Sequence, residues 1–387
     1  MNQSMINTMN KNVCSAVRTA RLGLRVPGAR PACLIRRGAA QIATLALASI
    51  TTASLLLGSG ASADPFVFST GNPDGKIATL SRPSDIDRIE TETADDFITS
   101  SCIVIYQATF TGLLPAGAPL SSISEVEVEL YHVFPADSVS PPSGNVPTRV
   151  NSPADVEISS ATRDGQAGSL TFTATLVNSS FQVANSVVNG IHKFPNQKTF
   201  GEGAVTGEEV LITVTFHPPI ALPPDHYFFR PEVQSSSGNF LWLSAPKPIV
   251  APGTPFTPDL QTWIRNADLK PDWLRIGTDI TAQGPFNAAF SLVGETDSDC
   301  DGVGDSVDQC PNTPPGSIVN ADGCSIDQLA PCAGPASGGT WKNHGQYVST
   351  VARVSEEFVQ QGLITEEQRD QIISQAAQSD CGSNAHR

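Results

Sequence analysis

The stretch SEVEVELYHV, residues 124–133, alternates between acidic and apolar side chains from residue 125 to residue 130. In an extended chain Val126, Val128 and Leu130 point to one face, and the three intervening glutamates point to the other. A period of two over this length is typical of a strand that is buried on one face only. The stretch therefore predicts a β-strand with its glutamates in solvent.

The same period recurs at residues 170–176 and 210–216, where apolar residues alternate mainly with Thr. Loops rich in proline and glycine, such as residues 141–153 and 251–258, separate runs of this kind. Many short strands joined by turn residues indicate two packed sheets or a jelly roll. We therefore expect residues 64–294 to form one mainly β domain with a β-sandwich or jelly-roll-like fold.

Residues 1–63 begin with a basic region, continue into an apolar run at about residues 42–57 and end in Ala61-Ser62-Ala63. This order predicts a secretory signal peptide cleaved near Ala63, and an uncleaved N-terminal anchor is the alternative. The segment holds seven of the 23 basic residues and none of the 38 acidic ones, so cleavage leaves 16 against 38, a net charge of −22. Such an exported chain, without a further membrane segment, should repel nucleic acid and attract divalent cations.

Residues 331–387 change from strand-like to helical spacing. Apolar residues recur at three- and four-residue intervals within residues 341–361. Thr365 followed by Gln368 fits the capping box of a second helix that ends near residue 377. We expect a short helical hairpin tied by a disulfide, because helices of this length are marginal alone.

The intervening residues 295–330 contain eight acidic residues and no Lys or Arg. Within them, DSDCDGVGDSVDQCPNTPPGSIVNADGC spans residues 297–324 and places aspartates at positions 1, 3, 5, 9 and 12 of a twelve-residue loop. Glycine stands at position 6, where a calcium loop turns sharply, and position 7 supplies a carbonyl. The spacing predicts one calcium site, and a solvated acidic linker without a metal is the alternative. The expected ligands are Asp297, Asp299, Asp301, Val303 (through its carbonyl), Asp305 and Asp308.

The whole stretch resembles a thrombospondin type-3 repeat, with the pattern D-x-D-x-D-G-x-x-D-x-x-D-x-C-P followed by a Gly-Cys pair. Bacterial exported proteins use similar repeats as linkers between domains. The resemblance implies calcium binding and, from the animal members, a role in matrix and adhesion. Cys300 departs from the pattern, because the repeat has glycine or another small residue there.

The β region also resembles an exported bacterial jelly-roll-like domain of unknown role. The resemblance rests on FSTGNPDGKIATLSRP (68–83), ETADDF (92–97) and NAAFSLVG (287–294). It implies a fold and an exported location, and it carries no activity over to this chain.

Six cysteines remain after signal cleavage, an even number that indicates disulfides in an oxidising compartment. The resemblance implies a Cys310–Cys324 bridge, and Cys332 and Cys381 bracket the helical tail. A Cys102–Cys300 bridge would pin the acidic loop to the sandwich edge. The alternative is a local Cys300–Cys310 bridge that leaves Cys102 free.

Signatures of catalysis are weak, since neither G-x-S-x-G nor H-E-x-x-H occurs. We expect Asp95 and Asp96 to begin a strand at a turn, although a paired catalytic site or a second calcium site is the alternative. Arg230 and Glu232 should form a cross-strand polar pair. Core packing is the expected role of three tryptophans that could instead stack on sugars: Trp242, Trp263 and Trp273.

These observations favour an exported, calcium-binding, non-enzymatic protein of a binding or adhesion type. Its expected partner is an extracellular protein or a glycan. A carbohydrate-binding or carbohydrate-active protein is the first alternative, and it would need exposed tryptophans and paired carboxylates in one groove. A structural spacer of a surface layer is the second alternative, and it would need no concave site.

Overall fold

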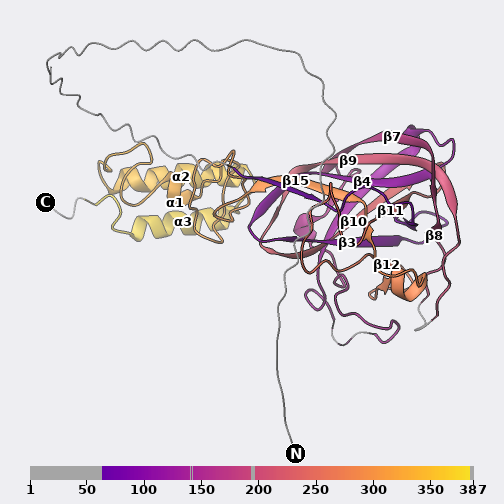
Figure 1. Ribbon diagram of the computed structural model, residues 1–387. Helices are drawn as coiled ribbons and strands as arrows, with labels where there is room; N and C mark the ends of the chain where they lie inside the picture. Colours follow the sequence, from indigo (N-terminus) through magenta and orange to yellow (C-terminus); the bar gives the residue numbers. More distant parts are fainter. Residues whose placement is uncertain (1–62, 140, 142, 193–196, 384–387) are drawn as a thin grey trace, which may run out of the picture. The chain divides into compact units, whose positions relative to one another are not determined.

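The computed structural model describes residues 63–139, 141, 143–192 and 197–383. The predicted signal peptide lies outside these residues apart from Ala63. Strands dominate the described part and form two sheets, which confirms the expected mainly β class (Figure 1). No helix in the described ranges is long and apolar enough to cross a membrane.

The larger sheet has nine strands. They are β1 (Pro65–Ser69), β2 (Ile77–Leu80), β4 (Ile103–Pro115), β7 (Leu170–Val183), β8 (Asn185–Val187), β9 (Val205–Leu222), β11 (Leu241–Ala245), β14 (Asn287–Ala288) and β15 (Phe290–Thr296). The long strand β4 pairs with β9 on one side and with β15 and β11 on the other. All pairs are antiparallel except β2 with β8. The sheet thus brings the first strand, β1, next to the last, β15.

The smaller sheet has six strands in the order β13 (Leu274–Arg275), β12 (Trp263–Asn266), β3 (Thr91–Thr99), β10 (Asp225–Ser235), β5 (Ile123–His132) and β6 (Arg163–Asp164). The strand predicted at residues 124–133 is β5, which pairs antiparallel with β10. Three short helical turns interrupt the loops: η1 (Leu120–Ser122), η2 (Ser159–Ala161) and η3 (Ile276–Ile280).

One apolar cluster joins the two sheets. Val126 and Leu130 of β5 share it with Ile212 and Val214 of β9, and all four are at most 1% exposed. Full burial of one such side chain stabilises the folded state by about 1.5–3 kcal/mol. The alternating apolar residues of the sequence therefore form the core, as expected.

The expectation that the glutamates of β5 lie in solvent is wrong for Glu129, which is 8% exposed. The outer face of the smaller sheet is itself covered, because Trp273 and Ala154 from long loops pack with Tyr131 of β5. The indole Nε1 of Trp273 donates to the Ala154 carbonyl at 3.1 Å, which fastens the two covering loops to each other.

Glu129 belongs to a buried charged network centred on Arg230. Arg230 and Glu232 lie on the same strand, β10, so the expected cross-strand pair is wrong, and the cross-strand neighbour of Arg230 is Glu129. The guanidinium contacts Glu129 closely, Glu232 at 2.7 Å and Glu92 at 3.5 Å. On the next strands Arg265 contacts Glu92 as well. Glu129 is therefore surrounded by these charged side chains and not by the solvent that the alternating pattern predicted.

Glu127 is the half-buried neighbour of this network, and burial together with the nearby Glu129 raises its pKa from 4.5 to about 7. The folded chain therefore binds more protons than the unfolded chain between these pH values, so stability falls as the pH rises through them. We expect Glu127→Gln to stabilise the protein by about 1–2 kcal/mol at pH 8, after allowance for partial solvent exposure, and to have little effect at pH 4.5. Thermal melts at both pH values measure the difference. Equal effects at the two pH values would contradict the prediction.

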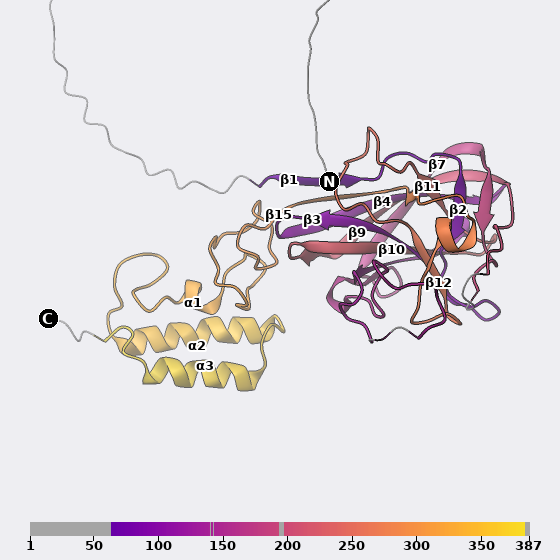
Figure 2. The same ribbon diagram turned by 60° about the horizontal axis from the view of Figure 1, so that its bottom comes forward.

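Helices occupy the C-terminal region, as predicted: α1 (Ile326–Leu329), α2 (His344–Gln360) and α3 (Glu366–Gln378). Asn343 caps α2 through its side chain, and Thr365 forms the expected capping box with Gln368 at the start of α3. Figures 1 and 2 both show α2 and α3 side by side, and their apolar faces share buried clusters. A Cys332–Cys381 disulfide, with a Cα–Cα distance of 4.8 Å, closes this region as expected.

The β domain should fold without the tail, because its core consists of its own strands. Strand β15 continues to Thr296, two residues past the expected boundary, and pairs there with Ile103. We expect a fragment of residues 64–296 carrying Cys102→Ser to melt cooperatively with a β-type circular dichroism spectrum. A fragment without a cooperative melt would show that the acidic loop and the tail complete the fold.

Candidate metal centre

The acidic loop begins where strand β15 ends. The N–H of Asp297 donates to the Cys102 carbonyl at 3.1 Å, and the N–H of Asp305 donates back to the Thr296 carbonyl at 3.0 Å. A disulfide joins Cys102 to Cys300 with a Cα–Cα distance of 5.5 Å. The loop is therefore fastened to the larger sheet at its start and in its middle.

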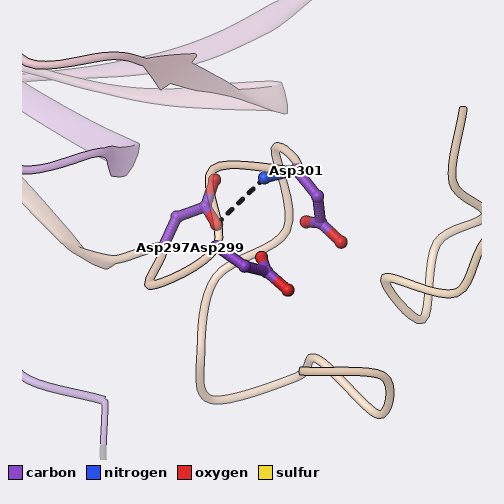
Figure 3. A group of neighbouring side chains, drawn as sticks. All are labelled: Asp297, Asp299 and Asp301. Atoms are coloured by element: carbon purple, nitrogen blue, oxygen red, sulfur yellow. Dashed lines mark hydrogen bonds between the residues drawn. The ribbon is translucent and has the colours of Figure 1, made fainter. Parts of the chain in front are cut away.

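Three of the predicted ligands converge inside this loop (Figure 3). One carboxylate oxygen from each of Asp297, Asp299 and Asp301 lies within 4.8 Å of the other two. Asp297 is 4% exposed, and its oxygens accept hydrogen bonds from the N–H groups of Asp301 (3.2 Å) and Gly302 (2.8 Å). Asp301 Oδ1 accepts from the Val303 N–H at 2.9 Å. Backbone N–H groups of the loop itself thus orient two of the three carboxylates.

The other oxygen of Asp301, Oδ2, is buried and has no hydrogen-bond partner among the described residues. An unpaired buried oxygen of a charged group costs about 1–3 kcal/mol or more. A cation bound beside Asp301 would remove this cost. The donors are all oxygens, the preference of hard cations such as calcium, and the loop supplies no thiolate or imidazole for softer metals.

The charge state of the cluster points to the same need for a cation. Burial raises the pKa of Asp297 to about 6, and the neighbouring carboxylates of Asp301 and Asp299 add to this effect. Burial also raises the pKa values of Asp301 and Asp308, again with contributions from nearby aspartates. Without a cation, the carboxyl groups of Asp297, Asp301 and Asp308 are therefore harder to ionise than in water.

Asp305 has a different environment from the three converging aspartates. Its oxygens accept hydrogen bonds from the Ser298 N–H at 2.8 Å and from the Thr296 hydroxyl at 2.7 Å. Burial alone would raise its pKa, but these donors outweigh burial and lower the pKa. In this structure Asp305 braces the start of the loop.

Asp308 lies on the Asp301 side of the cluster, next to Gly323. Asp308 Oδ1 accepts from the Cys310 N–H at 2.7 Å. A Cβ atom added to Gly323 would clash with Asp308 Oδ1 and lie 3.3 Å from Asp301 Oδ2, so both oxygens face the space beside this glycine. Gly323 has a φ of +75°, and substitution there would strain the backbone and displace both carboxylates.

Gly302, at loop position 6, has a φ of +94°, the sharp turn that the sequence predicted there. Cys300 also has a positive φ, of 62°. This conformation costs a residue with a side chain about 1–2 kcal/mol, which explains why a glycine would be easier to accommodate there. The Cys102–Cys300 bridge holds Cys300 in this conformation.

All three expected disulfides are present. Cys310 and Cys324 join with a Cα–Cα distance of 5.0 Å, so the alternative Cys300–Cys310 bridge does not form.

Thr313 is a further residue of the site, which the sequence pattern does not indicate. It is 2% exposed, and its N–H donates to Asp299 Oδ2 at 2.6 Å. A buried threonine in a proline-rich segment gives no pattern that would distinguish it beforehand.

Asp95 and Asp96 do not begin a strand at a turn, because β3 starts at Thr91. The carboxylate of Asp95 accepts from the Ala288 N–H at 2.7 Å, and the carboxylate of Asp96 accepts from the Leu260 N–H and contacts His226 Nε2 at 2.8 Å. Asp95 also accepts from the Thr262 hydroxyl at 3.2 Å, so the two carboxylates fasten β14 and the segment 260–262 to β3.

No protein-family model matches this chain, no curated protein matches its sequence, and no solved structure matches it.

Proposed function

We propose that this is an exported, calcium-binding, non-enzymatic protein of a binding or adhesion type, in which residues 295–330 act as a thrombospondin type-3-like repeat. The observation that carries the proposal is the convergence of Asp297, Asp299 and Asp301, together with the buried and unpartnered Asp301 Oδ2. These three residues would hold the ion, with Asp308 beside them. The spacing adds the Val303 carbonyl and Asp305 as further ligands of the proposed site.

A bound calcium ion would supply two positive charges to a loop whose carboxylates are crowded and partly desolvated. It would thereby stiffen the connection between the β domain and the helical tail. The chain contributes the pre-orientation: the amides of Asp301 and Gly302 fix Asp297, and Thr313 fixes Asp299.

The remaining features support an extracellular location and a jelly-roll-like sandwich for the β domain. The three disulfides suit an oxidising compartment. The alternative of a tryptophan-based carbohydrate platform gains no support, since Trp242, Trp263 and Trp273 are each 0% exposed. Of the two partner classes, this proposal therefore favours an extracellular protein over a glycan.

Isothermal titration calorimetry with calcium on residues 64–387 tests the proposal. We expect one site with a dissociation constant on the order of 10⁻⁴–10⁻³ M, the range of extracellular modules. Asp301→Asn should weaken binding at least about tenfold, because it removes a charged ligand from the centre of the cluster.

The matched control is Asp322→Asn, which neutralises an exposed aspartate of the same segment whose carboxylate contacts Gln309. This variant should bind calcium like the unmodified chain. Two results would show that the acidic segment is a solvated linker. The unmodified chain could give no heat of calcium binding, or the heat could fall equally in both variants.

A further inference from the structure

The helical tail contains an open groove of about 520 Å³ between α2, α3 and the segment 316–327. Its apolar lining includes Ile318, Ile326, Tyr347, Val351, Ile372 and Ala376, with three serines and one glutamine among the other lining residues. This volume lies in the range of ligand-binding sites, and the lining combines apolar side chains with a smaller number of polar ones. Ile318 remains 45% exposed, so the chain leaves part of this apolar surface open to solvent.

The charge around the groove selects the chemistry of an occupant. Among the described lining residues Asp327 is the only charged one. Residues 295–383 contain fourteen acidic and three basic residues, a net charge of −11. Such a surface attracts cationic partners and repels anionic ones. An apolar segment that carries Lys or Arg would match both the apolar lining of the groove and the negative charge around it.

One wall of the groove is connected to the candidate metal centre through Thr313. Its N–H donates to Asp299 Oδ2, and its hydroxyl lies 2.9 Å from the Gly323 carbonyl oxygen and 2.9 Å from Gln328 Oε1. Gln328 belongs to α1, the helix that presents Ile326 to the groove. Direct contacts therefore connect the Asp299 carboxylate to the groove through Thr313 and Gln328.

From these contacts we infer that the groove is a calcium-controlled docking site for a basic, apolar peptide segment of an extracellular partner protein. The inference rests on the proposed function, because calcium is its control. The ion would hold Asp299 in the cluster, Asp299 would hold Thr313, and Thr313 would hold the wall formed by α1 and the disulfide-closed segment 310–324. Without the ion, repulsion among the three converging carboxylates would release this wall.

Fluorescence anisotropy with two synthetic helical peptides tests the docking site on residues 64–387. Both peptides carry the same leucine face, and one has Lys and the other Glu at every polar position. We expect the Lys peptide to bind at least tenfold more tightly in calcium than in a chelator, and the Glu peptide not to bind. Equal binding of both peptides, or no binding of the Lys peptide in calcium, would overturn the inference.

Variants locate the binding site. Gln375→Trp fills the groove from the exposed side of α3, and Ile318→Lys places a positive charge on its apolar wall. Each should weaken Lys-peptide binding at least tenfold. Ile86→Lys, at a fully exposed isoleucine of the β domain, is the matched control and should leave binding unchanged. Loss of binding in Ile86→Lys as well would place the site elsewhere.

Gln328→Leu tests the connection, since it removes the contact between α1 and the Thr313 hydroxyl but keeps Thr313 and its N–H to Asp299. We expect it to bind calcium nearly normally while losing the calcium dependence of peptide binding. Calorimetry in parallel separates the two proposals. If the chain gives a heat of calcium binding but does not bind the peptide, the docking site alone is overturned. If it binds the peptide but gives no heat of calcium binding, both the calcium control and the proposed function are overturned.

Discussion

Removal of the Cys102–Cys300 bridge is expected to weaken calcium binding at least about tenfold and to lower the free energy of unfolding by about 2–5 kcal/mol. The bridge closes a sequence separation of 198 residues, so it strongly restricts the unfolded chain. It also acts in the folded state, because Cys300 lies between the proposed ligands Asp299 and Asp301. Calorimetry with calcium and denaturant melts on Cys102→Ala/Cys300→Ala measure both effects.

The backbone at Cys300 requires a second variant as a control, because its φ of 62° also disfavours alanine. Cys102→Ala/Cys300→Gly removes the bridge but tolerates that conformation. If covalent attachment to the sheet orders the site, calcium binding should weaken in both variants. Normal calcium affinity in the glycine variant would assign the effect to backbone strain and would make the loop an autonomous site.

Arg230→Met is expected to destabilise the β domain by about 3–5 kcal/mol, the range for loss of one partner of a buried ion pair. Arg230 is 1% exposed, and the substitution would leave Glu232, which is 0% exposed, without its ion-pair partner. Glu92, in contrast, would keep Arg265 and Lys270. Burial already raises the pKa of Glu232 well above its ordinary value, because one guanidinium cannot neutralise all of its carboxylate neighbours. Urea melts at pH 7 provide the measurement.

Two comparisons sharpen this prediction. Arg353→Met breaks an exposed ion pair with Glu357 on α2 and should cost less than about 1 kcal/mol. The double variant Arg230→Met/Glu232→Gln should be more stable than the sum of its single effects, because it removes a buried charge together with its partner. A loss below about 1 kcal/mol for Arg230→Met would show that water reaches the network.

The sequence alone determined the local structure of this protein, because local structure follows from spacing along the chain. The alternation in residues 124–133 fixed a strand, and Thr365 with Gln368 fixed the start of a helix. The glycine at position 302 fixed the turn of the acidic loop. Each of these features depends on neighbours a few residues apart, whose preferences act before any tertiary contact forms.

Only the tertiary structure decided which charged residues leave the solvent and which aspartates converge. Glu129 of β5 looks solvated in sequence, yet loops that include Ala154 and Trp273 cover that face, and Arg230 of the neighbouring strand β10 pairs with Glu129. Asp305 has the spacing of a ligand, yet Thr296 and Ser298 hold its carboxylate. The physical reason is that burial and hydrogen-bond partners come from segments far apart in the chain, and no local period records which segments will meet.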